Sequence, residues 1–183
     1  LLMETDGHPA AVVDEAARME AIAREHRARD VRTARDEAEG LQLAAARRNA
    51  FAALARRRPT TILEDVTVPR SELATMVRFI ADTAAAFNLQ IGTFGHMGDG
   101  NLHPTFLTDE RDAAEIARVH QALDAIVRRT LELGGTITGE HGVGVLKKEW
   151  LSREIGPVAM RLHRDIKRVL DPQGILNPGK IFD

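Results

Sequence analysis

The chain has 183 residues, 44% of them hydrophobic, and a formal net charge of −2 at pH 7, which fits a globular protein with a core of its own. It contains no cysteine, which excludes disulfides, thiolate metal sites and cysteine nucleophiles. The weak negative charge argues against nucleic-acid binding, and no apolar run approaches the roughly 20 residues that span a bilayer. We therefore expect a cytoplasmic protein. Because the sequence starts at Leu1 and ends abruptly at "NPGKIFD", we also expect a piece of a longer protein, and a processed or tag-cleaved small protein is the alternative.

The first 70 residues predict alternating strands and helices. Asp6-Gly7 would end the first strand, Pro9 suits a first helical turn, and the β-branched run before Pro69 is typical of a strand. The predicted elements are strands at 1–5, 31–35 and 61–68 and helices at about 9–28 and 36–57.

The second half predicts a helix, a hairpin and two further helices. Ser71 and Thr108 are suitable N-caps, and Gly134-Gly135 would end the helix that Thr108 begins. A helix from Pro157 to Leu170 would direct Val158, Leu162, Ile166 and Val169 inward. The remaining elements are a helix at 71–87 and strands at 89–96, 101–107 and 136–138. This order favours an α+β fold of ferredoxin-like type, with an antiparallel sheet flanked by helices.

The hairpin sequence "FGHMGDGNLHP" (94–104) carries two histidines. Asp-Gly between two strands favours a two-residue type I′ turn, because both turn residues need positive φ. With Asp99-Gly100 as that turn, His96 faces His103, with Cβ atoms roughly 4.5–5.5 Å apart. Two imidazoles at that distance can bind one metal ion, although two histidines at such a spacing more often belong to an ordinary turn.

A metal site needs further ligands, and "TGEHGVG" (138–144) offers them. His and carboxylate ligands with one open position are typical of catalytic zinc-like sites. Glu140 and His141 lie between glycines that allow close backbone approach. They are candidates for a third ligand and a general base, and an ordinary loop is the alternative.

Three longer motifs resemble a known family. They are "GHMGDGNLHP" (95–104), "GGTITGEHGVGVLKKEWL" (134–151) and "IKRVLDPQGILNPGKIF" (166–182), and "LEDVTVPRSEL" (63–73) and "ARRNAF" (46–51) agree with them. Together they resemble the C-terminal domain of FAD-linked oxidases, a group of glycolate oxidase flavin subunits, cytochrome-linked D-lactate dehydrogenases and D-2-hydroxyglutarate dehydrogenases.

The resemblance implies a two-part organisation. Residues 1–145 would form an α+β cap and substrate domain. Residues 146–183 would form a C-terminal helix and tail that complete a flavin-binding domain absent from this chain. The partners would be that N-terminal FAD-binding domain of the same protein, a small 2-hydroxy acid, and an electron-acceptor subunit, cytochrome or quinone, through which the protein could associate with a membrane.

The resemblance also implies roles for individual residues. His96, His103 and Glu140 would bind a divalent metal, Zn or Mn, and His141 would be the catalytic base. The substrate carboxylate would bind Arg47 or, as the alternative, Arg48. The further implied contacts are Asn101 to substrate and Glu140, Gly142, Asn177 and Lys180 to FAD.

The implied function is oxidation of a small 2-hydroxy acid of glycolate or D-lactate type. Metal-assisted removal of a proton would accompany hydride transfer to FAD. The fragment would be inactive alone. The alternatives are a stand-alone metal-binding module or metal-dependent hydrolase with the same His/His/Glu cluster, and an inactive cap retained for assembly.

Overall fold

A computed structural model describes residues 1–182 and divides the chain into two units, Leu1–Ala53 and Leu54–Asp183. The first unit holds helices α1 (Pro9–Glu25) and α2 (Glu37–Arg48) and most of α3 (Ala50–Ala55). The side chains of His8 and Asp36 cap α1 and α2 by accepting backbone N–H bonds. The helix predicted over 36–57 is therefore present, but it is interrupted at Asn49, the C-cap of α2.

The strands predicted at 1–5 and 31–35 are wrong, because both segments are irregular. A short apolar run becomes a strand only when it pairs with a neighbour, and neither of these runs does so in the described structure.

The second unit is built on a four-stranded antiparallel sheet with β4 (Asn101–Thr108) at its centre. β3 (Gln90–His96) pairs along one side of β4, and β1 (Thr60–Leu63) and β2 (Val66–Thr67) pair along the other. The strand predicted over 61–68 is thus split at Glu64-Asp65. The strand predicted at 136–138 is reduced to one antiparallel bridge, between Thr136 and Thr67.

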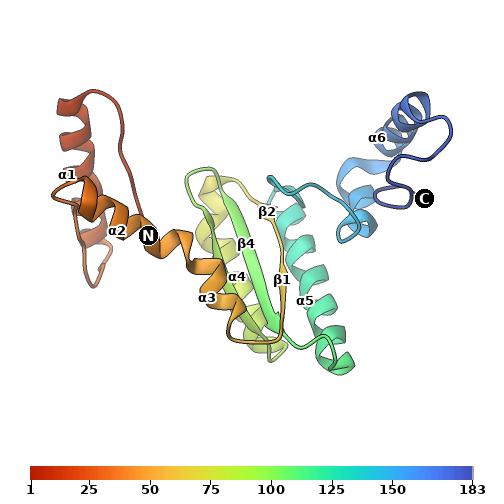
Figure 1. Cartoon of the computed structure of the whole chain (residues 1–183), viewed down its shortest axis with the longest axis horizontal. Helices are drawn as coiled ribbons and strands as arrows, with labels where there is room; N and C mark the ends of the chain where they lie inside the picture. Colours follow the sequence, from red (N-terminus) through yellow and green to blue (C-terminus); the bar gives the residue numbers. More distant parts are fainter. Residues whose placement is uncertain (183) are drawn as a thin grey trace. The chain divides into compact units, whose positions relative to one another are not determined.

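This topology confirms the predicted α+β, ferredoxin-like class. Taking β1 and β2 as one interrupted strand, the spatial order is the Thr136 segment, β1/β2, β4 and β3, and the crossovers are α4 (Leu73–Ala86) and α5 (Ala113–Glu132). Both helices lie beside the sheet in Figure 1. Two predicted N-caps are wrong. Ser71 lies inside a short 3-10 helix, η1 (Arg70–Glu72), that precedes α4. Asp112 rather than Thr108 caps α5, and its carboxylate accepts the Glu115 N–H.

The core lies between α4, α5 and one face of the sheet. Leu102 and Phe106 of β4 are fully buried there together with Met76 and Ile80 of α4 and Ile126 of α5. Because side chains alternate along a strand, Asn101, His103 and Thr105 face the opposite side of the sheet.

Helix α6 (Lys148–Leu170) is longer than the predicted helix from Pro157 and is kinked at Gly156, whose φ is +71°. Before the kink it contributes Trp150 and Leu151 to the core. Beyond the kink Met160 is buried, but the predicted inner face is wrong, because all four of its apolar side chains are exposed: Val158, Leu162, Ile166 and Val169. None of the helices within residues 1–182 is both long and apolar enough to cross a membrane.

The β3–β4 hairpin has a different register from the predicted one. His96 pairs with Asn101 and Phe94 with His103, so the connection has four residues, 97–100, instead of two. The Asp99 N–H bonds to the His96 carbonyl, and Gly100 takes up the positive φ of +84°. The shift amounts to two residues, an even number, so His96 and His103 remain on one face as diagonal neighbours.

Candidate metal and catalytic site

Two histidines of the hairpin and the carboxylate of Glu140 converge on the sheet face opposite the helices. Glu140 Oε1 lies 3.2 Å from His103 Nε2 and 3.4 Å from His96 Nε2. The two imidazoles meet edge to face, with ring centroids 5.6 Å apart. Thus the His96/His103/Glu140 set implied by the family resemblance is brought together, although the hairpin register that predicted the histidine pair was wrong.

The two distances from Glu140 suit ligands of one divalent cation, and all three donor atoms lie within 4.8 Å of one another. Ligands placed about 2.0–2.2 Å from a tetrahedral zinc ion lie about 3.3–3.6 Å from one another, close to the two distances from Glu140. His103 is buried, whereas the side chains of His96 and Glu140 are 38% and 51% exposed. The exposed side leaves room for a further ligand, as in catalytic rather than structural zinc sites.

A second triad, Asp65/His103/His141, also has its donor atoms within 4.8 Å of one another. Its carboxylate, however, is already fully engaged. Asp65 Oδ2 accepts the Thr138 hydroxyl and three successive backbone N–H groups, those of Gly139, Glu140 and His141, at 2.8–3.0 Å. Asp65 Oδ1 accepts the Asn101 side-chain N–H at 2.5 Å. The first triad is therefore the better candidate for a metal.

The cluster's electrostatics follow from these contacts. Burial by itself raises the pKa of Asp65, but hydrogen bonds from the His141 amide, the Asn101 side chain and the Glu140 amide outweigh it and hold that pKa well below its usual range. Burial, together with the neighbouring His141, lowers the pKa of His103. A neutral imidazole is the form that binds a metal.

Behind Asp65 lies a buried acid–base pair. Lys147 Nζ donates to the Asp65 carbonyl at 2.5 Å and lies 3.9 Å from the Glu64 carboxylate. Burial raises the pKa of Glu64 against the opposing effect of Lys147, and burial lowers the pKa of Lys147 against the effects of Glu64 and Asp65. Both Glu64 oxygens are without a hydrogen-bond partner in the described structure.

His141, the predicted base, lies at the open side of the cluster. Its ring stacks on His103, with centroids 4.8 Å apart and planes within 4°. Its Nε2 lies 3.6 Å from Glu140 Oε1, and the side chain is 39% exposed. The next residue, Gly142, has a φ of +79° and donates its N–H to the Thr138 hydroxyl. His141 is therefore oriented by stacking while its edge stays accessible.

The other predicted site residues lie in different places. Arg47 and Arg48 are in the last turn of α2, in the first unit. Asn101 is buried beside the cluster, where its side-chain NH₂ donates to Asp65 and Thr67. Asn177 and Lys180 line a pocket of about 680 Å³ formed by the end of α6 and the tail. Their roles in binding substrate or FAD stay predictions.

Sequence reasoning missed Asp65 and Lys147 as parts of the site. A signal for Asp65 was present, because Glu64-Asp65 places two carboxylates in the middle of the apolar, β-branched run "TILEDVTV". Polar residues at intended core positions need a functional reason. For Lys147, in a basic stretch before α6, the sequence offers no signal that separates it from Lys148.

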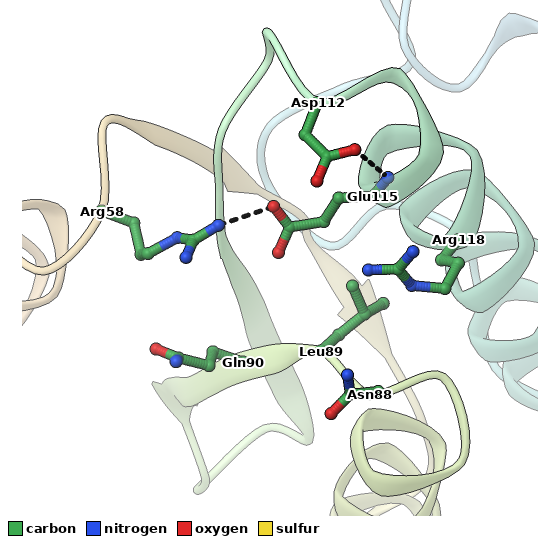
Figure 2. A pocket seen from close by; sticks show the side chains of 7 residues that line it. All are labelled: Arg58, Asn88, Leu89, Gln90, Asp112, Glu115 and Arg118. Atoms are coloured by element: carbon green, nitrogen blue, oxygen red, sulfur yellow. Dashed lines mark hydrogen bonds and ion pairs between the residues drawn. The ribbon is translucent and has the colours of Figure 1, made fainter.

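A second hollow, of about 310 Å³, lies where β3 begins and near the start of α5. Figure 2 shows Arg58 paired with Glu115, and Asp112 bonded to the start of α5. The Arg118 side chain donates to the Phe87 carbonyl. These charged side chains therefore bond to one another or to the backbone. The residues that line the hollow include no histidine. The His/His/Glu cluster is thus the stronger candidate site.

The sequence matches the family described as "FAD linked oxidases, C-terminal domain" over residues 1–181. The chain belongs to this family. This FAD-linked oxidase domain is 50% identical over 182 residues to glycolate oxidase subunit GlcD of Bacillus subtilis, covering 100% of the chain and 39% of the relative. It is 36% identical over 180 residues to the Escherichia coli K12 subunit of the same name, covering 98% of the chain and 36% of the relative.

A third relative carries a different substrate in its name. The domain is 40% identical over 118 residues to D-lactate dehydrogenase [cytochrome] 1, mitochondrial, of Saccharomyces cerevisiae, covering 64% of the chain and 20% of the relative. The FAD-linked oxidase domain thus spans well under half the length of the curated relatives it matches.

Proposed function

We propose that the chain is the substrate- and metal-binding part of an FAD-dependent oxidoreductase that acts on a small 2-hydroxy acid. One observation carries the proposal: in a member of the FAD-linked oxidases, His96, His103 and Glu140 converge with His141 stacked beside them. Family membership favours this function over the metal-dependent hydrolase.

His96, His103 and Glu140 would hold the divalent cation, which supplies a Lewis acid that lowers the pKa of a bound hydroxyl. Two imidazoles and a carboxylate suit Zn²⁺, and Mn²⁺ is the alternative. FAD would supply the acceptor for the hydride.

His141 would then accept the hydroxyl proton while the hydrogen on C2 leaves with its electron pair as hydride, so that the hydroxy acid becomes a 2-oxo acid and the flavin is reduced. Stacking on His103 supports this role because it holds the ring plane of His141, whose side chain is 39% exposed and would be open to a bound substrate. Arg47 or Arg48 would pair with the substrate carboxylate, for which a guanidinium is suited.

The FAD-binding part of the same protein is the proposed partner. The exposed apolar side chains of α6 and the tail pocket with Asn177 and Lys180 offer it a surface, and the chain covers 39% of its B. subtilis relative. An acceptor subunit, cytochrome or quinone would reoxidise the flavin. Among substrates we favour glycolate over D-lactate, because the 50% identity is to a glycolate oxidase subunit.

The test is a chimera in which this chain replaces the matching segment of the B. subtilis subunit, produced in a strain that lacks that subunit. We expect extracts to reduce a dye with glycolate, and a His141→Ala chimera to lose at least about 100-fold, the lower end of what a general base contributes. A folded chimera that retains FAD but reduces no dye with either glycolate or D-lactate would refute the function. Faster reaction with D-lactate would overturn the substrate preference.

A further inference from the structure

The loop that carries Glu140 and His141 is held by a single buried carboxylate. Asp65 is 0% exposed, and its Oδ2 accepts the three consecutive backbone N–H groups of Gly139, Glu140 and His141. Successive backbone N–H groups that converge in this way form a concave anion-binding site. Here the anion belongs to the chain itself, so the loop is shaped around a side chain that lies 73 or more residues away in the sequence.

The same carboxylate also reaches the hairpin. Asp65 Oδ1 accepts from Asn101, the residue paired with His96, and lies 3.8 Å from His103 Nδ1. Within the described structure His103 Nδ1 has no hydrogen-bond partner. In metal sites the second nitrogen of a ligating histidine is commonly oriented by a carboxylate. Asp65 is thus placed between the two segments that supply the metal ligands.

The loop has little freedom to adopt another position. A Cβ added to Gly139 would lie 2.1 Å from Asn101 Nδ2 and 2.3 Å from Thr67 Oγ1, so the backbone is pressed against the side chains that also surround Asp65. Lys147 donates to the Asp65 carbonyl from behind, which fixes the backbone of Asp65. Lys147 thus keeps Asp65 in place, and the 138–141 loop is bonded to the carboxylate of Asp65.

We propose that Asp65 is the positioning residue of the site: its carboxylate holds the 138–141 loop so that Glu140 reaches the histidine pair and His141 stacks on His103. The metal ligands remain His96, His103 and Glu140, and the role assigned to Asp65 is to hold the loop. The proposal rests on the proposed metal site for its functional meaning, but its structural content, the loop bonded to Asp65, can be tested without metal.

The chain provides a matched control in the adjacent residue. Glu64 is also buried, at 1% exposed, but it faces Lys147 and makes no hydrogen bond to the 138–141 loop within the described structure. Asp65→Asn and Glu64→Gln are the same isosteric change at neighbouring buried carboxylates. The Asn amide would direct an NH₂ or a weaker acceptor at the loop N–H groups.

The experiment measures two properties of the 183-residue chain. The first is the ¹H–¹⁵N NMR signals of the Gly139, Glu140 and His141 amides without metal. The second is Zn²⁺ affinity by calorimetry. We expect Asp65→Asn to move all three amides upfield, to remove their protection from exchange, and to weaken Zn²⁺ binding about 10–100-fold, as loss of an orienting partner does. Glu64→Gln should leave both properties unchanged.

Two results would overturn the proposal. Asp65→Asn could leave the three amides and the affinity as in the parent, or Glu64→Gln could change both as much as Asp65→Asn does. If circular dichroism shows that Asp65→Asn does not fold, Thr138→Val decides, because it removes one donor to Asp65 at 2.9 Å. It must shift the loop amides and weaken Zn²⁺, and no change in either refutes the proposal. A parent chain that binds no Zn²⁺ would refute the metal site, while the amide signals would still test Asp65.

Discussion

Glu140 is the metal ligand whose removal tests the site with the least disturbance to the fold. In Glu140→Gln one carboxylate oxygen becomes an NH₂ while the side chain keeps its shape. The side chain is 51% exposed, and such a surface change usually alters the free energy of unfolding by less than about 0.5 kcal/mol. Any large loss of metal affinity would therefore come from the ligand set and not from folding.

The magnitude follows from the geometry of the three ligands. Glu140 Oε1 lies 3.2 Å and 3.4 Å from the two histidine nitrogens, so removing the carboxylate leaves only the two imidazoles as ligands. Loss of a partner that merely orients a ligand costs about 10–100-fold in affinity. Loss of a direct and charged ligand should reach at least the upper end, about 100-fold, which is about 2.8 kcal/mol.

The assay is calorimetric titration of the parent chain, Glu140→Gln and Glu149→Gln with Zn²⁺ at pH 7.5, with urea unfolding of the metal-free chains. Glu149 is an exposed glutamate in the first turn of α6, outside the cluster. We expect only Glu140→Gln to lose affinity, with unfolding unchanged in all three. Equal affinity of the parent and Glu140→Gln would refute the assignment of Glu140 as a ligand.

Three further predictions concern stability. Because burial lowers the pKa of His103, the unfolded chain binds its proton at a higher pH than the folded chain does. The stability that neutral His103 provides is therefore present above about pH 6.5 and is lost as pH falls through the lower folded pKa. We expect the free energy of unfolding in urea and EDTA to differ less between pH 7.5 and 5.5 in His103→Gln than in the parent. An equal difference in the two proteins would contradict this. Gly139→Ala should lower the free energy of unfolding by about 1–3 kcal/mol, because the new Cβ would collide with Asn101 and Thr67. Gly98→Ala should be near neutral, because a Cβ at Gly98 would meet no atom within 4 Å in the described structure. Equal unfolding midpoints of the two variants in urea would contradict the close packing around Gly139. Phe106→Ala should lower the free energy of unfolding by about 3–5 kcal/mol, because Phe106 is 0% exposed, and a loss below about 1 kcal/mol would show that the core repacks.

The sequence was sufficient for the elements that have strong local signals. The apolar periodicity of α4 and α5 and the strands around the glycine-rich hairpin were predicted, and their order indicated the α+β class. The failures have local causes. The segments at 1–5 and 31–35 have strand-like composition but pair with no strand within residues 1–182. The apolar stripe of α6 has helical periodicity, but its four side chains are exposed in this chain, because periodicity shows which face of a helix is apolar and not what covers that face.

The site shows the same division between local and tertiary information. His96 and His103 came together despite the wrong hairpin register, because a shift of two residues preserves the face. Two adjacent carboxylates in an apolar run mark Asp65 as unusual, but its partners could not be predicted, because its side chain bonds to residues 73–76 positions further along the chain. Arg47 and Arg48 belong to the first unit, and family likeness remains the basis for their proposed role.

The most direct test of the central claim is a crystal structure of the chain soaked with Zn²⁺, with anomalous data collected at the zinc edge. We expect a strong peak about 2.0–2.2 Å from His96 Nε2, His103 Nε2 and Glu140 Oε1. A peak bound by Asp65 and His141 instead, or no peak among these side chains at saturating Zn²⁺, would contradict it.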